Sequence, residues 1–244
     1  MKVIVLNSKE EIGIQTSKIM IEEVKNKSDT IFGLATGSSP ITTYEAIIGD
    51  HQDKGTDWSK VKTFNLDEYV GLSPDHNQSY RHFMNVNLFD HINIDKKNTF
   101  IPTGVGDYEG FASKYDDLIA EHGGIDVQLL GLGTNGHIGF NEPPVDFESK
   151  TSVVDLVEST IEANSRFFQS INEVPKKAVS MGIQTIMKAK KIILIANGKS
   201  KATAIKQLIE GNVDKNWPCT ILQKHKNLTI IIDDEASSLL LKKY

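Results

Sequence analysis

The sequence predicts an α/β fold in which an open, mainly parallel sheet carries helices on both faces, a Rossmann-like three-layer sandwich with its active site at the carboxyl ends of the strands. Two features of the 244-residue chain predict it. Apolar runs of strand length alternate with longer amphipathic stretches of helical period. Several of these runs end in glycine, serine or acidic residues, as strands do where they approach a ligand. No linker-like segment interrupts the chain, so we expect one domain over residues 1–244.

The first strand and the first helix are expected at the start of the chain. Residues 3–6 are apolar and of strand length. Ser8 precedes Glu11 by three residues, the spacing of a capping box, which predicts that a helix begins there. Later strands are expected at 31–35, 61–64, 125–130, 191–196 and 228–232, with extended segments at 151–157 and 178–181. Later helices are expected after Pro40, at 79–89, 108–121 and 159–168, after Gly182, at 201–209 and at the C-terminus.

The turn after the second strand combines Thr36, Gly37, Ser38, Ser39 and Pro40. Serine at the N-cap followed by proline at the first helical position predicts that a helix begins here. One interpretation is that Ser39 only caps this helix. Capping alone does not require Thr-Gly-Ser in front of it, so we favour binding of an anion such as phosphate by free backbone N–H groups at the positive end of the helix dipole.

Two adjacent acids, Asp67 and Glu68, follow the strand at 61–64. The carboxyl ends of strands are where open α/β sheets bind their ligands. Because side chains alternate in extended chain, we expect only one of the two carboxylates to face a given cavity. Taken alone, the stretch would be interpreted first as a solvated acidic turn.

A glycine-rich loop follows the strand at 125–130 and contains Asn135, His137 and Glu142. Glycines allow positive φ angles and close approach of a ligand to the backbone. A histidine with a carboxylate five residues away supplies the parts of an acid/base pair. An ordinary connection would not explain why histidine, asparagine and glutamate occur together, so we expect the chemistry here.

The same loop contains the dinucleotide-binding pattern Gly131-x-Gly133-x-x-Gly136, with Asp155 about 20 residues further on. That pattern needs a helix to begin at its last glycines so that a pyrophosphate can bind at the helix N-terminus. Here the prolines that start at Pro143 would break such a helix almost at once. We therefore favour a proton-transfer loop over a dinucleotide site.

Two cations of the C-terminal half are candidates for binding an anion. Arg166 stands beside an aromatic pair in the expected helix at 159–168. Lys201 falls in the first turn of the helix after the strand at 191–196, where a positive charge opposes the helix dipole. An anionic ligand would explain that placement, although a lysine directed to solvent is the common alternative.

Composition excludes several classes of function. The net charge of −5 and the pI of about 5.8 give no electrostatic basis for binding nucleic acid or a membrane surface. The single cysteine, Cys219, excludes an internal disulfide framework and favours a reducing cytoplasm, and we see no targeting segment. His76, His82 and His91 are unevenly spaced and lack a matching ligand set, so we expect no metal site.

The three strand ends together suggest a type of chemistry. A carboxylate in an apolar cavity can abstract a proton from carbon beside a carbonyl, and a His–Glu pair can transfer a proton to or from an oxygen atom. A phosphate-binding turn would hold the far end of the substrate in place. The residues alone thus indicate isomerase-like chemistry on a phosphorylated sugar.

Four motifs of the chain resemble the glucosamine-6-phosphate deaminase family. They are LATGSSP (34–40), FNLDEY (64–69), GTNGHIGFNEP (133–143) and ANSRFF (163–168). The resemblance extends from the first strand nearly to the C-terminus, with the motifs in the family's order and at its approximate spacing. It implies conversion of D-glucosamine 6-phosphate and water into fructose 6-phosphate and ammonia, in the cytoplasm and without a cofactor or metal.

The resemblance also implies a role for each site residue. His137 would open the sugar ring by proton transfer at the ring oxygen, with Asn135 and Glu142 orienting it. Asp67 would take the proton from C2. The residues that the resemblance implies for binding the phosphate are Thr36, Gly37, Ser38, Ser39, Arg166 and Lys201. Arg166 could bind the phosphate bidentately, and Lys201 would act as a point charge.

The chain departs from the family pattern in two places. Many members have aspartate where this chain has Asn135, so Glu142 must provide more of the electrostatic support for the histidine. Members that are activated by N-acetylglucosamine 6-phosphate have a basic pair shortly after the glutamate, whereas this chain has Thr-Ser-Val-Val at 151–154. We therefore expect the short, non-allosteric branch of the family.

Two alternatives belong to other classes of function. A 6-phosphogluconolactonase would share the phosphate turn and a Gly-His loop, but would not be expected to contain the FNEP segment or the DEY segment. A non-catalytic sugar-phosphate sensor would keep Arg166, Lys201 and Ser38 but has no need of Asp67 and His137 together. The sequence does not decide whether the protein forms a homo-oligomer. An exposed apolar stripe that could form an interface cannot be told apart, in the sequence, from the apolar residues of the core.

Overall fold

The computed structural model describes residues 1–162 and 164–244. Ala163, the first residue of the ANSRFF motif, lies outside the described residues. No helix in the described part of the chain is long and apolar enough to cross a membrane.

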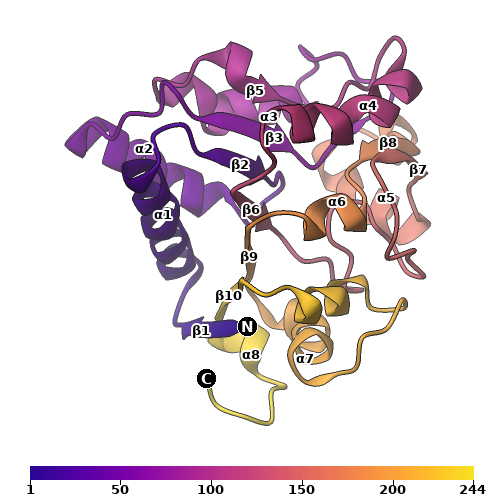
Figure 1. The fold of residues 1–244 in the computed structure, drawn as a ribbon. Coiled ribbons are helices and arrows are strands. Elements are labelled where there is room, and N and C mark those ends of the chain that lie inside the picture. The colour runs from indigo at the N-terminus through magenta and orange to yellow at the C-terminus, as the bar shows by residue number, and fades with distance from the viewer.

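A seven-stranded sheet forms the middle of the molecule (Figure 1). Its strands in spatial order are β1 (Lys2–Leu6), β10 (Leu228–Asp233), β9 (Lys191–Ala196), β6 (Val127–Leu130), β2 (Ile31–Leu34), β3 (Lys62–Asn65) and β5 (Thr99–Phe100). Every neighbouring pair is parallel. The central strands are buried along their length, as strands covered on both faces must be.

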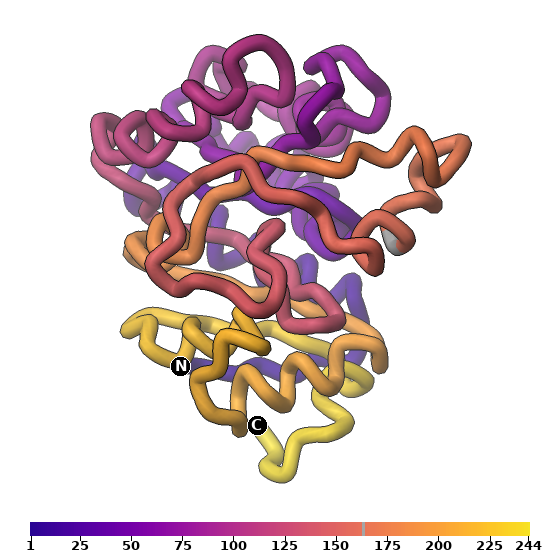
Figure 2. The backbone as a smooth tube through the Cα atoms, turned by 90° about the vertical axis from the view of Figure 1, so that its right-hand side faces the viewer, coloured from indigo at the N-terminus to yellow at the C-terminus, as the bar shows by residue number. Residues whose placement is uncertain are grey.

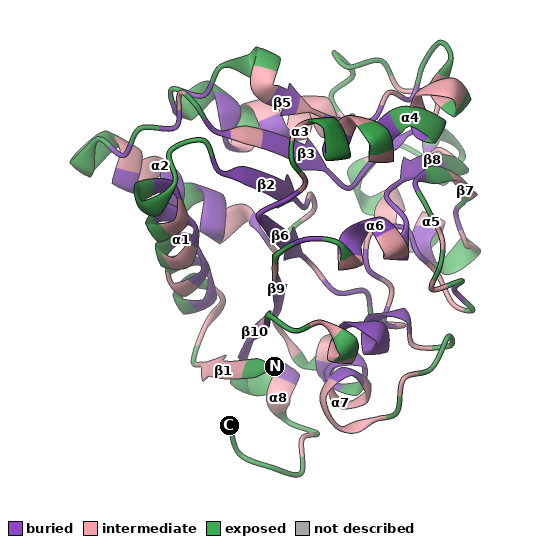
Figure 3. Cartoon of the chain, viewed as in Figure 1, coloured by how far each residue is buried: buried purple, intermediate pink, exposed green. Residues whose placement is uncertain are grey.

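Helices cover both faces of this sheet. On one face lie α1 (Lys9–Asn26), α2 (Ile41–Lys54) and α3 (Tyr80–Asn87); on the other lie α4 (Tyr108–Glu121), α6 (Ile183–Met187), α7 (Ala202–Glu210) and α8 (Asp234–Ser237). Alternate residues of one strand enter the two cores: Ile193 and Ile195 face α1 and α2, whereas Ile192 and Leu194 face α6 and α7. Buried residues accordingly concentrate in the sheet and on the inner faces of the helices (Figure 3). The predicted three-layer fold is confirmed.

The strand order reverses between β2 and β6. From β2 the chain builds outward through β3 to β5, whereas from β6 it builds the other way through β9 and β10. The loops that leave β2 and β6 therefore diverge and leave a crevice at the carboxyl ends of the two strands, the usual ligand site of such sheets. The loops still approach each other, since a Cβ on Gly131 would lie 4.0 Å from the Cβ of Ser39.

A second, antiparallel sheet was not expected. It consists of β4 (Asp67–Tyr69), β8 (Lys177–Ser180) and β7 (Ser152–Asp155), and α5 (Glu158–Asn164) follows β7. Figure 2 shows the chain between about residues 150 and 180 in front of the main sheet. The sequence predicted that residues 151–157 and 178–181 are extended, but it did not predict that they pair with each other or with β4. Periodicity reports only that a segment is extended, and the pairing depends on residues far away in the chain.

The start of α2 corrects one expectation. The helix begins at Ile41 with Pro40 as its N-cap residue, and no side chain makes a capping hydrogen bond. Ser39 is therefore not the cap. At α1 the prediction is closer: Ser8 accepts from the Glu11 N–H, but the Glu11 carboxylate bonds the N–H of Asn7 rather than that of Ser8.

Candidate active site

A cavity of about 240 Å³ opens at the crevice between the ends of β2 and β6. Its walls come from the loops after β2, β3 and β6, from the chain at and after α5, and from the segment before α7. The predicted site residues that line it are Thr36, Gly37, Ser38, Ser39, Asp67, His137, Arg166 and Lys201. Asn135 and Glu142 lie behind His137 and contact its ring. The structure thus brings every sequence-predicted site residue to one place.

The His137 ring is held through its Nδ1 atom. Nδ1 lies 2.7 Å from Asn135 Oδ1 and 3.2 Å from Glu142 Oε2. The Asn135 Nδ2 group donates to the same Glu142 oxygen at 2.7 Å. Since that bond turns Oδ1 of the amide toward the ring, Nδ1 faces two acceptors and must itself carry a proton. In the neutral ring, Nε2 is then the free base.

The Glu142 carboxylate is buried, with its side chain 8% exposed. Burial alone would favour the protonated form, but hydrogen bonds from His137, Thr160 and Asn135 outweigh it and hold the pKa of Glu142 below its usual range. The Thr160 hydroxyl provides the bond to the second oxygen, Oε1, at 2.5 Å. Glu142 is therefore a fixed negative charge behind the histidine.

Glycines in the loop make room for this arrangement. A Cβ on Gly133 would lie 2.4 Å from atoms of the His137 ring, so a side chain there would displace the histidine. Gly136 adopts φ +83°, and its carbonyl accepts from the Cys219 N–H. No helix begins anywhere in residues 131–151, all of which the structure describes. The expectation that no helix follows these glycines is confirmed.

Asp67 reaches the same cavity from β4. A Cβ on Gly139 would lie 3.7 Å from Asp67 Oδ2, so the histidine loop and the acid are neighbours. Ser180 of β8 connects the two, because it pairs with Asp67 in the small sheet and accepts from the Phe140 N–H at 3.1 Å. Burial, and then the charge of Glu68, raise the pKa of Asp67 to about 8.

Glu68 has a different task, as the alternation of the two acids predicted. It accepts backbone hydrogen bonds from Tyr69, Tyr80 and Arg81, two of them at the start of α3. A carboxylate there satisfies free N–H groups at the positive end of a helix dipole. Burial nevertheless raises the pKa of Glu68. Of the two acids, Asp67 is the one that faces the cavity.

Positive charge and free backbone donors also line this cavity. Burial, and then the charge of Arg166, lower the pKa of Lys201. Within the described residues, neither cation forms an ion pair with a carboxylate, although both line the cavity. No described residue accepts a hydrogen bond from the backbone N–H groups of 36–39. Two neighbouring cations and free N–H groups are the kinds of donor that an anion such as phosphate prefers.

Sequence reasoning missed several residues of the cavity wall. Tyr80, Phe140 and Thr160 line it but carry no local signal of function. Tyr80 and Phe140 stack with ring centroids 6.2 Å apart, in a small core that also contains Tyr69. Only the pairing of β4 with β8 brings these segments together. No group of three or more His, Cys, Asp or Glu side chains in the described residues could hold a metal ion.

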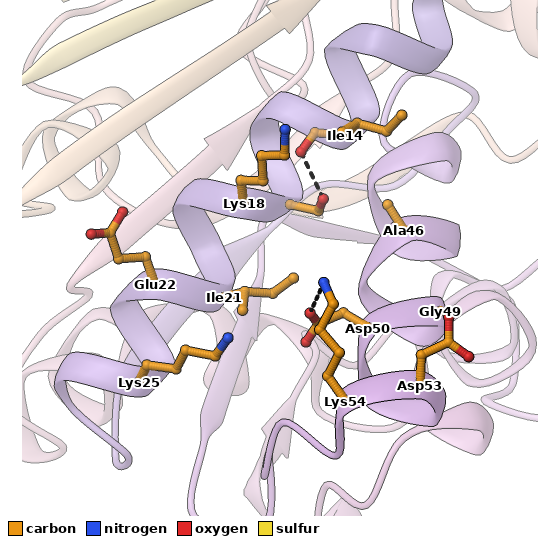
Figure 4. A pocket seen from close by; sticks show the side chains of 11 residues that line it. Ile14, Lys18, Ile21, Glu22, Lys25, Ala46, Gly49, Asp50, Asp53 and Lys54 are labelled. Carbon is orange, nitrogen blue, oxygen red and sulfur yellow. Dashed lines mark hydrogen bonds and ion pairs between the residues drawn. The ribbon is translucent and has the colours of Figure 1, made fainter.

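A larger hollow, of about 510 Å³, lies between α1 and α2 (Figure 4). It is lined by charges of both signs, including Lys18, Lys25 and Glu22. Lys54 bonds Asp50 at 3.1 Å, so part of this charge is compensated within the groove. It lacks a histidine–carboxylate pair and the free N–H groups of a turn. The smaller cavity is the candidate active site.

Comparisons with known proteins identify the family to which the chain belongs. Residues 10–231 match the model of the family described as glucosamine-6-phosphate isomerases/6-phosphogluconolactonase. The glucosamine-6-phosphate deaminase of Clostridium novyi (strain NT) is 53% identical over 241 residues, which cover 98% of this chain and 100% of the relative. That of Thermoanaerobacter sp. (strain X514) is 52% identical, over 98% of this chain and 95% of its own.

Solved structures give the same result. The structure of a monomeric glucosamine-6-phosphate deaminase superposes with a TM-score of 0.96 at 45% identity, covering 98% of this chain and 100% of the other. A 6-phosphogluconolactonase from Trypanosoma cruzi has a TM-score of 0.80 at 21% identity, over 99% of this chain and 97% of its own, and shares the fold.

The raised pKa of Asp67 predicts a pH-dependent gain in stability for Asp67→Asn. The folded state holds a proton up to about pH 8, whereas an unfolded aspartate releases it near pH 4. The stability of the wild type should therefore fall as the pH rises from about 4 to about 8. Asparagine removes that loss, so its gain in Tm should be absent near pH 4 and largest at pH 8 and above.

Calorimetry in phosphate-free buffers would measure this gain. Asp75→Asn, which removes an exposed carboxylate from a loop, is the matched control and should show no such trend. An equal change in Tm at pH 5 and pH 8 for Asp67→Asn would contradict the burial of a protonated carboxyl.

Proposed function

The chain belongs to the family of glucosamine-6-phosphate isomerases and 6-phosphogluconolactonases, and within it we propose that the protein is a glucosamine-6-phosphate deaminase. It converts D-glucosamine 6-phosphate and water into D-fructose 6-phosphate and ammonia, a step of amino sugar catabolism. The observation that carries this proposal is one cavity with three parts: a buried carboxyl with a raised pKa, a histidine with its proton fixed on Nδ1, and two cations without a carboxylate partner among the described residues.

The histidine opens the sugar ring. Nε2 of His137 is the ring nitrogen left free by Asn135 and Glu142, so it takes the proton of the C1 hydroxyl and delivers one to the ring oxygen. The bond between C1 and the ring oxygen breaks and leaves an aldehyde at C1. Glu142 stabilises the imidazolium formed in between and keeps its tautomer fixed.

Asp67 performs the carbon chemistry. The aldehyde at C1 acidifies the C2 hydrogen, and the Asp67 carboxylate takes it to give an enol-amine. Reprotonation at C1 yields a C2 imine. Water adds to that imine, the amine leaves as ammonia, and C2 becomes the ketone of fructose 6-phosphate. The change is thus an isomerisation followed by hydrolysis of an imine.

The phosphate is held opposite these groups. We place it between Arg166, Lys201 and the turn at 36–39, where positive charge and free N–H groups are available. A dianion there compensates both cations, and its binding energy fixes the distance from C2 to Asp67. Arg166 presents a fork of donors that suits a phosphate, whereas Lys201 provides a compact charge.

The two alternatives leave parts of the site unexplained. Hydrolysis of a lactone requires water and a proton donor. It does not require a buried base that removes a proton from carbon. A sugar-phosphate sensor would need the cations but not the buried Asp67, which destabilises the fold when it ionises. Both 6-phosphogluconolactonase function and a sensing role are therefore less well supported than deamination.

We infer a cytoplasmic location from the thiol chemistry. Cys219 is the single cysteine of the chain and is buried. Burial raises the pKa of its thiol to about 12, so the group stays protonated and acts as an apolar core atom. A protein with one inert thiol suits a reducing compartment.

Asp67→Asn is expected to abolish turnover while leaving substrate binding intact. Without a general base, ammonia release from D-glucosamine 6-phosphate should fall by about 10²- to 10⁴-fold. Exchange of the C2 hydrogen with deuterated solvent, followed by NMR, should be lost with it. Exchange that persists in the variant would show that another group is the C2 base.

Arg166→Ala is expected to lower kcat/KM for D-glucosamine 6-phosphate by about tenfold to a hundredfold, the loss of a charge-assisted hydrogen bond. Turnover of D-glucosamine, which has no phosphate, should be nearly unchanged. Arg166→Lys keeps the positive charge but loses the paired N–H donors of the guanidinium, so its kcat/KM for D-glucosamine 6-phosphate should lie between those of the wild type and Arg166→Ala. Equal losses on both substrates would place Arg166 elsewhere than at the phosphate.

Activation by N-acetylglucosamine 6-phosphate is expected to be weak or absent. The segment at 151–154 lacks the basic pair that activated members of the family carry shortly after the glutamate. Initial rates against D-glucosamine 6-phosphate should therefore be hyperbolic with or without the acetylated sugar phosphate. A sigmoidal curve that the acetylated compound makes hyperbolic would contradict this expectation.

A further inference from the structure

The Thr160 side chain contacts Glu142, and the reaction steps proposed above assign no role to this contact. It lies in the first turn of α5, is 6% exposed, and lines the cavity. Its Oγ1 lies 2.5 Å from Glu142 Oε1. Because an ionised carboxylate only accepts, the hydroxyl is the donor.

This bond completes the fixation of Glu142. Oε2 of the carboxylate accepts a hydrogen bond from Asn135 Nδ2 and faces His137 Nδ1. Among the described residues, Thr160 is the donor to Oε1. Rotation about the last bond of a glutamate is broad, so one oxygen held by its own loop leaves the carboxylate free to pivot. A second donor from a different segment removes that freedom.

The same segment also carries the proposed phosphate ligand. Asn164 lies one turn after Thr160 in α5, and Arg166 follows in the 3₁₀ turn Ser165–Phe167; all three line the cavity. Ile161 and Phe168 pack on the small core that contains Phe140 of the histidine loop. A ligand that fixes Arg166 therefore also restrains the backbone that places the Thr160 hydroxyl.

We propose that Thr160 is a positioning residue that holds Glu142 against His137 and couples this contact to the phosphate bound at Arg166. The inference rests on the proposed deaminase function for its kinetic consequences. The contact itself does not depend on that function. Phosphate binding thus supports ring opening at a distance, through one short segment of chain.

Removing the hydroxyl has a definite physical effect. Thr160→Val has nearly the same shape but leaves Oε1 of Glu142 buried without a donor. The carboxylate then either rotates away from His137 or takes up a proton more readily, since the Thr160 bond helps to hold its pKa down. In both cases His137 loses support. Thr160→Ser keeps the donor and is the matched control.

The kinetic test compares these two variants. Thr160→Val should lower kcat for D-glucosamine 6-phosphate by about tenfold or more, with KM changed less than threefold, whereas Thr160→Ser should stay near the wild type. Equal losses in the two variants, or a loss confined to KM, would overturn the proposal.

The pH profile separates positioning from packing. The acidic limb of kcat/KM should move to higher pH in Thr160→Val, because Glu142 must be ionised and now keeps its proton longer. The titratable group that contacts Glu142 is His137, on its own loop, and from α5 the neighbour is the neutral Thr160. The other charged groups of the cavity are Asp67, which lies near Gly139 of the histidine loop, and Arg166 and Lys201. An unshifted limb would mean that the hydroxyl does not act on Glu142.

The coupling between the phosphate site and the Thr160–Glu142 contact is tested by supplying the sugar and the phosphate-like anion as separate molecules. Inorganic phosphite should accelerate ammonia release from D-glucosamine by the wild type and by Thr160→Ser, and the acceleration should fall at least about fivefold in Thr160→Val. The same acceleration in all three proteins would overturn the coupling.

A measurement without turnover distinguishes failure of this inference from failure of the proposed function. The ¹⁵N chemical shifts of the His137 ring report the proton on Nδ1, and they should change in Thr160→Val but not in Thr160→Ser. A wild type that releases no ammonia would refute the deaminase function alone. Identical His137 shifts in wild type and Thr160→Val would refute the role of Thr160.

Discussion

The reversal of strand order between β2 and β6 is the constraint from which the site follows. Two adjacent parallel strands send their chains in opposite directions, so neither loop can cover the crevice between them. One loop supplies the turn at 36–39 and the other supplies His137. The small antiparallel sheet then closes the crevice from the side, because β4 continues directly from β3 and brings Asp67 with it.

Electrostatic costs are concentrated in this crevice. Asp67 is buried beside another acid, while the partly buried Lys201 lies near the exposed Arg166, whose charge adds to the effect of burial in lowering the pKa of the lysine. Burial together with a nearby like charge raises the pKa of Asp67 and lowers that of Lys201, so the charged form of each group is disfavoured. An anionic group bound beside Lys201 and Arg166 would lower the second of these costs. Unfavourable placement of like charges is thus the physical mark of the site.

Asn135 shows how a neutral residue can replace a charged one in this site. Its amide donates to Glu142 and accepts from His137, so it links the two with complementary groups. An aspartate at this position would place a second carboxylate 2.7 Å from Glu142, and one of the two would have to hold a proton. With asparagine, a single negative charge supports the histidine.

The sequence by itself determined what depends on near neighbours. Apolar periodicity located β9 and α4 closely, and the glycines and prolines around His137 excluded a helix there. The tertiary structure alone decided which distant segments meet. The antiparallel pairing of β4 with β8 and the contact of Thr160 with Glu142 depend on long-range packing. Local patterns report the conformation of a segment, whereas its partners are selected by the free energy of the whole fold.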